Sequence, residues 1–213
     1  MPHLVEERKE ATGFFKTAFY YSFRSMFLPI TKVLMWARVT PNGVTVFSMV
    51  LAIVTGTLMA VDRFGWGIIA GLAMGFSDIV DGQLAKVSGQ TSQFGGILDS
   101  AVDRYNEFFV FAGYGVRYYW LGRPVMVFAC AAAFAGSVMV SYVKARAEAD
   151  GYECKVGRLQ RPERLSLIGI GTLIAFLGFE IGLDAVIVFL AVATQITAIH
   201  RLEHVRRQTL KSS

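Results

Sequence analysis

The chain has 213 residues, of which 54% are apolar and 17% are charged, whereas an average soluble domain is about 25% charged. Its mean hydropathy of +0.48 excludes a disordered chain, a coiled coil and a small disulfide-stapled secreted domain. The net charge of +5 comes without the basic patch of a soluble nucleic-acid-binding domain, so no nucleic-acid partner is expected. These quantities indicate a membrane protein with basic residues placed unevenly around its spans.

The N-terminal segment precedes any long apolar run. Residues 13–37 mix aromatic and aliphatic side chains with Lys16, Arg24 and Lys32, a pattern typical of an amphipathic helix in the membrane interface. Residues 1–12 are polar and carry charges of both signs, so no cleavable signal peptide is expected before this helix.

Six charge-free runs follow, at residues 43–61, 64–77, 108–116, 124–143, 165–179 and 185–199. The first and fourth can cross a bilayer unaided, and the others become long enough when extended through flanking polar positions. We therefore predict an all-α integral membrane protein, a six-transmembrane-helix bundle with an N-terminal interfacial amphipathic helix. A single domain is expected over residues 1–213, with an N-terminal segment at 1–40, the six-span bundle at 41–205 and a basic tail at 206–213.

Lysine and arginine residues gather on one predicted side of the membrane. Of the 21 in the chain, three lie on the opposite side, at Arg63, Arg117 and Arg123, and Arg104 lies inside a predicted span. The positive-inside rule then places both termini in the cytoplasm. We expect a multi-pass protein of the cell membrane, in contact with the lipid bilayer and with its acidic residues at the cytoplasmic side.

Four aspartates lie at the ends of the second and third spans. Asp78 and Asp81 are three residues apart, and Asp99 and Asp103 are four apart, so each pair projects from one face of its helix. The segment between the pairs contains Gly89 and polar residues and is predicted to be a tight turn. Two antiparallel helices joined there would bring the pairs face to face. Because ionisable residues at membrane depth are costly, this cluster indicates a functional site.

The chemistry of the cluster points to divalent cations. Four carboxylates in one small volume cannot all stay ionised without compensating positive charge. Oxygen ligands with no accompanying Cys or His suit Mg²⁺ or Mn²⁺ rather than zinc. A cation channel or transporter would use the same acids, so they do not by themselves decide between transport and catalysis.

The aspartates belong to a longer pattern. The string Asp78-Ile-Val-Asp81-Gly82-Gln-Leu-Ala85-Lys86 is followed after eight residues by Gly95, and then at intervals of four by Asp99 and Asp103. This pattern resembles the signature of the CDP-alcohol phosphotransferase (CDP-alcohol phosphatidyltransferase) family, D-x2-D-G-x2-A-R-x8-G-x3-D-x3-D. Seven of its eight fixed residues match over 26 positions. The departure is Lys86, which keeps the charge of the family's arginine but lacks its bidentate fork.

The resemblance implies a reaction and a role for each of the four acids. Such enzymes transfer the phosphatidyl group of CDP-diacylglycerol to an alcohol and release CMP, with two divalent ions, Mg²⁺ or Mn²⁺. By resemblance, Asp78 and Asp99 contact both ions, while Asp81 holds one and Asp103 the other. Asp103 is also the implied general base for the attacking hydroxyl. The family further implies a homodimer.

The resemblance also implies a donor site. A helix beginning at Pro41 offers backbone N–H groups that suit a phosphate. The residues expected to bind CDP-diacylglycerol are Pro41, Asn42, Gly43, Val44, Gly82, Lys86 and Ser92.

A second stretch indicates the acceptor. Residues 141–148 and 161–164 resemble the corresponding region of phosphatidylinositol-phosphate synthases in this family, whose acceptor is inositol phosphate. Several cations suit a dianionic phosphate, although basic residues at cytoplasmic span ends are also ordinary topological anchors. The residues expected to bind the acceptor phosphate are Ser141, Lys144, Arg146, Arg161 and Arg164.

Other functions stay open at this point. A glycerol-phosphate acceptor would make the chain a phosphatidylglycerophosphate synthase, and an archaeal-type inositol-phosphate lipid synthase is a further alternative. A divalent-cation transporter would need acids along a continuous polar path, whereas the last two predicted spans carry no second polar cluster. Arg104 is either a counter-ion of the acidic cluster or a snorkelling residue, and we favour the counter-ion.

Overall fold

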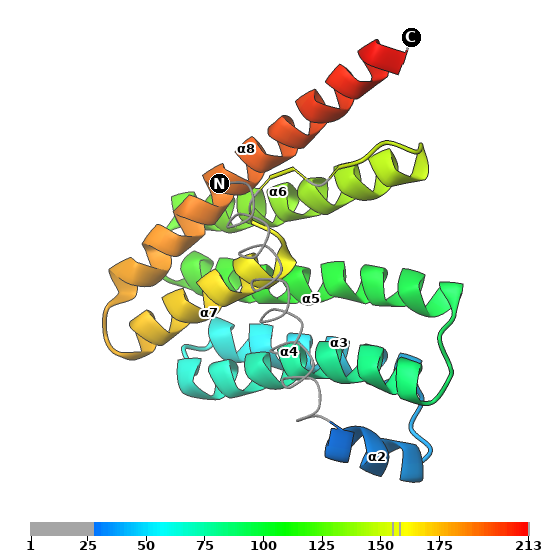
Figure 1. Ribbon diagram of the computed structural model, residues 1–213. Coiled ribbons are helices and arrows are strands. Elements are labelled where there is room, and N and C mark those ends of the chain that lie inside the picture. The colour runs from blue at the N-terminus through cyan, green and yellow to red at the C-terminus, as the bar shows by residue number, and fades with distance from the viewer. Residues whose placement is uncertain (1–27, 155, 158, 213) are drawn as a thin grey trace, which may run out of the picture. The chain divides into compact units, whose positions relative to one another are not determined.

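The computed structural model describes residues 28–154, 156–157 and 159–212, and this part of the chain is helical (Figure 1). In it, the helices are α2 (Leu28–Trp36), α3 (Pro41–Ala60), α4 (Phe64–Val87), α5 (Gln93–Trp120), α6 (Pro124–Ala149), α7 (Arg161–Phe176) and α8 (Glu180–Ser212). The predicted all-α class is confirmed for the described residues.

Helices α4 and α5 continue beyond the apolar runs from which they were predicted. Helix α4 runs past Ser77 to Val87, and α5 begins at Gln93, so the acidic positions of both helices are helical, as the extension of the runs required. The turn between them contains Gly89 at φ +70°, a left-handed conformation that glycine adopts without steric cost.

Among the described helices, α3, α4, α6 and α8 are long and apolar enough to cross a membrane. Only 28% to 44% of the most apolar 18-residue segment of each helix is buried. Large apolar side chains such as Val50, Ile69 and Phe128 therefore remain exposed. Exposed apolar surface on this scale is suited to lipid. Helix α5 differs because it carries five charged residues, and α7 because it has only 16 residues. The six-span count therefore stays a prediction for these two helices.

The N-terminal amphipathic helix is described only in part. Residues 13–27 of the predicted segment lie outside the described residues, and the remainder forms α2. In α2, Thr31 is buried and Trp36 is exposed.

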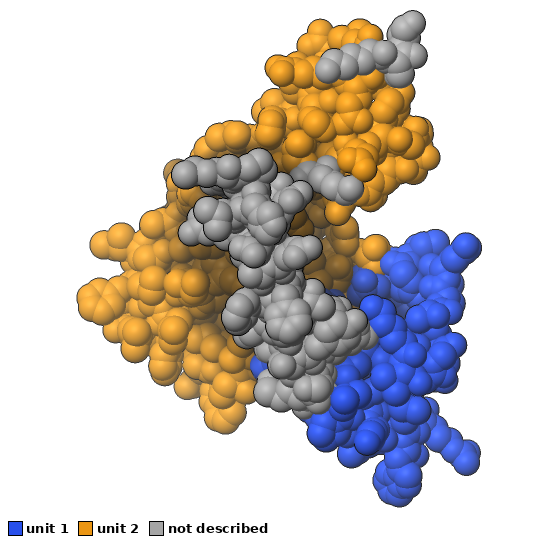
Figure 2. All heavy atoms as spheres, viewed as in Figure 1, with its two compact units in different colours: residues 1–47, 75–99 blue, residues 48–74, 100–213 orange. Residues whose placement is uncertain are grey.

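The chain divides into two compact units (Figure 2). The described part of unit 1 comprises residues 28–47 and 75–99, and that of unit 2 comprises residues 48–74 and 100–212. Unit 1 has a small apolar core of Val44, Val80 and Leu84, against which Leu34 and Ile79 pack.

Unit 2 holds the larger core. Its fully buried side chains include Tyr114, Leu183 and Ile187, and α8 packs against α6 and α7 (Figure 1). Helices α3 and α5 approach most closely at Gly56 and Gly113, where a Cβ on either residue would overlap the other helix's backbone. Small residues at helix crossings are typical of membrane bundles, in which close backbone packing drives association.

Ion pairs in unit 2 connect the loops that join α3 to α4, α5 to α6 and α7 to α8. Arg117, with 2% of its side chain exposed, pairs with Asp62 and, at 3.0 Å, with Glu180. Arg123 pairs with Asp184 at 2.8 Å, and hydrogen bonding to that carboxylate raises the pKa of the Arg123 guanidinium. These contacts join the α3–α4, α5–α6 and α7–α8 connections.

Candidate active site

The predicted acids come from α4 and α5, which carry two each. A carboxylate oxygen of Asp78 and one of Asp99 lie within 4.8 Å of each other, and Asp103 follows Asp99 one turn further along α5. Carboxylate oxygens so close together need positive charge between them. This donor set fits a divalent cation that prefers oxygen ligands, such as Mg²⁺ or Mn²⁺.

Asp81, the fourth predicted acid, has a different environment. It is 6% exposed, and its Oδ2 accepts a 2.6 Å hydrogen bond from the hydroxyl of Thr45 on α3. That bond restricts the orientation of the carboxylate. Sequence reasoning missed Thr45, because a threonine one turn into an apolar helix carries no signal of a distant partner. As a metal ligand, Asp81 stays a prediction.

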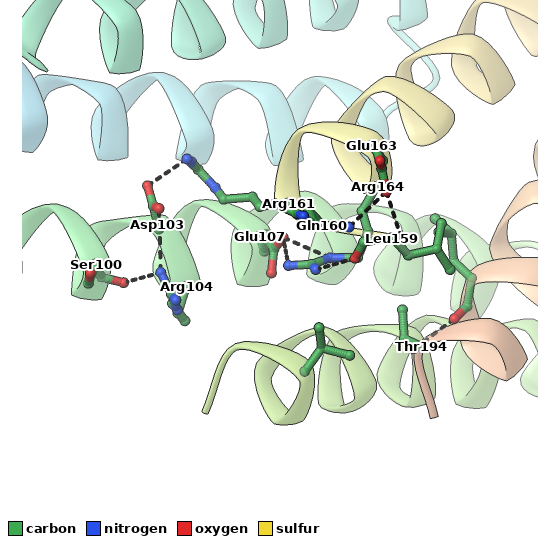
Figure 3. Close-up of polar contacts among 12 residues, drawn as sticks. Ser100, Asp103, Arg104, Glu107, Leu159, Gln160, Arg161, Glu163, Arg164 and Thr194 are labelled. Carbon is green, nitrogen blue, oxygen red and sulfur yellow. Dashed lines mark hydrogen bonds and ion pairs between the residues drawn. The ribbon is translucent and has the colours of Figure 1, made fainter. Parts of the chain in front are cut away.

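Asp103 has a cation at each carboxylate oxygen. The Nη1 atom of Arg161 lies 2.8 Å from its Oδ1, and Nη1 of Arg104 lies 3.4 Å from its Oδ2 (Figure 3). Arg104 also donates to the carbonyl oxygen of Ser100 at 2.7 Å. Arg104 is therefore a counter-ion of this acid, as the sequence indicated. The other counter-ion, Arg161, comes from α7 and is one of the residues predicted to bind the acceptor phosphate.

Arg164 is placed differently from Arg161. Its guanidinium contacts Oε1 of Glu107 at 2.6 Å and 3.2 Å, and both side chains are 2% exposed (Figure 3). Sequence reasoning also missed Glu107, although its position four residues after Asp103 puts it on the same face of α5. The contact of Arg164 with the acceptor stays a prediction, and the structure gives this guanidinium a protein partner.

The other predicted acceptor residues lie on α6. Lys144 is 3.8 Å from Glu148 and Arg146 is 3.0 Å from Asp150, each one turn along the helix, while Ser141 is partly buried. The predicted acceptor set therefore falls into one group near the end of α6 and another in the first turn of α7.

Several predicted donor residues gather in unit 1. A Cβ at Gly95 would lie 3.1 Å from Ser92 Oγ and 3.3 Å from Asn42 Oδ1, so the starts of α3 and α5 meet there. Ser92 caps α5 by accepting a 2.9 Å hydrogen bond from the Gly95 N–H. Thr40 caps α3 in the same way, through the Gly43 N–H at 3.2 Å. Pro41 and Val44 are buried beside these caps.

Gly82 and Lys86 lie on the last two turns of α4 and are exposed. A Cβ at Gly82 would meet no atom of the described residues within 4 Å. Protein packing therefore does not require glycine here, and the open space beside Asp81 is available to a ligand.

The fold and the site together define a class of protein: a multi-pass helical membrane protein with a carboxylate site suited to a divalent cation. Comparison with known proteins narrows this class. The model of the CDP-alcohol phosphatidyltransferase family matches residues 38–197. The chain therefore belongs to that family and is an enzyme of that kind, which decides between catalysis and transport in favour of catalysis.

The similar proteins extend over most of the chain. The phosphatidylinositol phosphate synthase of Mycobacteroides abscessus is 34% identical over 182 residues, covering 84% of this chain and 82% of the relative. The crystal structure of the Mycobacterium tuberculosis phosphatidylinositol phosphate synthase with CDP-DAG bound has a TM-score of 0.78 at 29% identity, covering 83% of this chain and 92% of that one. The structure of that enzyme with manganese and citrate has a TM-score of 0.77 at 30% identity, covering 83% and 87%.

Proposed function

We propose that this enzyme transfers the phosphatidyl group of CDP-diacylglycerol to inositol phosphate and releases CMP. The observation that carries the proposal is the similarity to phosphatidylinositol phosphate synthases over 84% of the chain, in a protein whose α4 and α5 bring carboxylate oxygens of Asp78 and Asp99 within 4.8 Å of each other. In the overall reaction, the acceptor hydroxyl oxygen bonds to the phosphatidyl phosphorus as the bond from that phosphorus to CMP breaks.

The donor would bind beside the ends of α3, α4 and α5 in unit 1. The first turn of α3 presents backbone N–H groups to a phosphate, and the Lys86 ammonium adds positive charge. The open space at Gly82 lets the donor approach the α4 backbone. Asn42 and Ser92, which the packing around Gly95 brings close together, are placed to contact the nucleotide.

The four signature aspartates would hold two divalent ions, Mg²⁺ or Mn²⁺. Such ions, when bound, supply positive charge that stabilises the diphosphate and the departing phosphate. The acids of α4 and α5 provide all-oxygen ligands, and Thr45 orients the carboxylate of Asp81. A partner that fixes a ligand in this way is typical of metal sites.

Asp103 would take the proton from the acceptor hydroxyl. Its two carboxylate oxygens are held by Arg161 and Arg104, so the group is oriented before the acceptor arrives. Basic residues on α6 and α7, with Ser141, would bind the acceptor phosphate. Charge-assisted hydrogen bonds from several cations suit a dianion of this kind.

Topology and assembly complete the proposal. Helices α5 and α7 would join the four apolar helices as spans, which gives six, with both termini and the active site on the cytoplasmic side. The enzyme would act as a homodimer in the cell membrane, next to its lipid donor.

The proposal is tested by CMP release from purified protein in detergent with CDP-diacylglycerol, Mg²⁺ and inositol 1-phosphate. Asp103→Asn should retain CDP-diacylglycerol binding and lose about 100-fold or more in turnover, because the proton acceptor is removed. Glu203→Gln is the matched control, since Glu203 forms exposed pairs with Arg206 and Arg207 near the end of α8. Turnover near that of the wild type in Asp103→Asn would contradict the role of this acid.

A further inference from the structure

Two ion pairs connect α5 to the first turn of α7. Asp103 and Glu107 lie one turn apart on α5, and Arg161 and Arg164 lie three residues apart on α7. The first pair joins Asp103 to Arg161 at 2.8 Å, and the second joins Glu107 to Arg164 at 2.6 Å (Figure 3). Residues spaced in this way share a helix face, so the two pairs are set one above the other between the same two helices.

The pairs differ in their access to water. The side chains of Asp103 and Arg161 are 13% and 17% exposed, whereas those of Glu107 and Arg164 are both 2% exposed. A buried ion pair resists separation, because losing one partner leaves the other charge uncompensated away from water. The partly exposed pair can exchange partners with a ligand, and the buried pair is suited to holding the helices in place.

Further contacts hold the start of α7 in one position. Arg164 also donates to the carbonyl oxygen of Leu159 at 2.9 Å. Glu163 accepts hydrogen bonds from the backbone N–H groups of Leu159 and Gln160, at 2.6 Å and 2.9 Å. These bonds occupy backbone groups at the helix N-terminus. The position of Arg161 relative to α5 is therefore set by the Arg164 contact one turn away.

We propose that Glu107 is a positioning residue: through its buried pair with Arg164 it holds the first turn of α7 against α5 and so keeps the Arg161 guanidinium at Asp103. The inference rests on the proposed function, in which Asp103 and Arg161 act on the acceptor. It gives Arg164 a structural partner in Glu107 in place of a direct contact with the acceptor phosphate.

The two roles of Arg164 predict opposite effects of Glu107→Gln. If Glu107 positions Arg161 through Arg164, the variant loses about tenfold or more in kcat/KM for inositol phosphate, while CDP-diacylglycerol affinity stays within about twofold. If Arg164 instead binds the acceptor directly, releasing it from Glu107 leaves the acceptor KM unchanged or lowers it, and the proposal fails. Glu203→Gln is the matched control, because Glu203 forms exposed pairs with Arg206 and Arg207.

A double-mutant cycle tests whether Glu107 acts through Arg161. In an Arg161→Gln background, adding Glu107→Gln should change acceptor kcat/KM by less than about twofold, because the group being positioned is already absent. If the fold-losses in acceptor kcat/KM of the two single variants multiply in the double variant, the proposal is overturned.

Arg164→Gln covers the case in which Glu107→Gln does not fold. Glu107→Gln leaves a buried guanidinium that cannot lose its charge, whereas Arg164→Gln leaves a carboxyl that can take up a proton. Arg164→Gln should also lose about tenfold in acceptor kcat/KM, and it should add less than about twofold to the loss in Arg161→Gln. If the two fold-losses in acceptor kcat/KM multiply instead, Arg164 is identified as an acceptor ligand and the proposal is refuted.

Amide hydrogen exchange separates this inference from the proposed function. In folded variants of either buried partner, the first turn of α7 should exchange about tenfold faster or more, with peptides of α3 unchanged. Unchanged exchange in α7 would contradict the positioning role. Wild-type protein that releases no CMP with any acceptor would instead refute the proposed function, whatever the exchange result.

Discussion

At the scale of single residues, Gly82 is a position where ligand binding, and not protein packing, explains the glycine. Alanine is favoured over glycine inside a helix by about 1 kcal/mol, and within the described part of the chain a Cβ at Gly82 would meet no atom within 4 Å. The fold therefore does not explain glycine at this position, whereas a ligand that approaches the α4 backbone beside Asp81 does.

Gly82→Ala should accordingly keep or slightly raise the free energy of unfolding, and lower the affinity for CDP-diacylglycerol by about tenfold or more. The matched control is Gly75→Ala, two turns earlier on α4, where a Cβ also meets nothing within 4 Å. Thermal unfolding and donor binding are measured on both. Equal donor affinity in the two variants would remove Gly82 from the donor site.

Thr45 provides a second test at this scale. Its hydroxyl donates to the buried Asp81 carboxylate at 2.6 Å, and loss of a partner that orients a metal ligand costs about 10- to 100-fold in metal affinity or activity. Thr45→Val should shift the Mg²⁺ or Mn²⁺ dependence of CMP release to higher concentration by such a factor. Thr57→Val is the control, because the Thr57 hydroxyl donates to the carbonyl oxygen of Ile53 on its own helix at 2.8 Å. An unchanged metal dependence in Thr45→Val would exclude this role.

At the scale of helices, the charged residues of α5 have two distinct uses. Near its start they face the proposed chemistry, and in its last turn Arg117 is buried against Asp62 and Glu180. The arginine side chain also lies 5.0 Å above the ring of Phe64. Arg117 and its two acidic partners connect loops, and they lie outside the signature segment in the sequence.

The double variant Asp62→Asn with Glu180→Gln should lower the free energy of unfolding by about 3 kcal/mol, because it leaves a buried guanidinium without a counter-charge. This is the low end of the usual range, since both acids are 55% exposed. Thermal unfolding in detergent is the measurement, with Asp150→Asn, which removes an exposed pair worth less than about 1 kcal/mol, as the control. A cost no larger than that of the control would show that these pairs do not stabilise the loop ends.

The helices themselves could be predicted from the sequence with useful accuracy. Charge-free runs located the described helices from α3 to α8, and the need for sufficient length placed the signature acids on α4 and α5. The partners of the site residues could not be predicted in this way. Thr45 and Asp81 are 36 residues apart, and Glu107 and Arg164 are 57 apart, so only packing reveals that they meet. Sequence spacing reports neighbours on one helix, and it carries no information about which helices face each other.

At the scale of the whole molecule, orientation in the membrane is the main expectation to test. The native Cys130 and Cys154 are buried, so a single added thiol can be labelled over a low background. Gln90, in the α4–α5 turn, and Leu121, in the α5–α6 turn, are both exposed. They are expected on opposite sides of the membrane, because α5 lies between them.

In intact cells, a membrane-impermeant maleimide should label Leu121→Cys and should not label Gln90→Cys until the membrane is opened. The asymmetry of lysine and arginine residues gives this direction. The reverse pattern would contradict the cytoplasmic active site, and labelling of both residues in sealed cells would contradict α5 as a span.

The most direct test of the proposed function is a competition between acceptors. Purified protein is incubated with CDP-diacylglycerol, Mg²⁺ and equal concentrations of inositol 1-phosphate, free inositol and glycerol 3-phosphate, and the lipid products are identified by mass spectrometry. Phosphatidylinositol phosphate is the expected dominant lipid, formed together with an equal amount of CMP. Phosphatidylglycerophosphate or phosphatidylinositol as the dominant product would contradict the proposed acceptor.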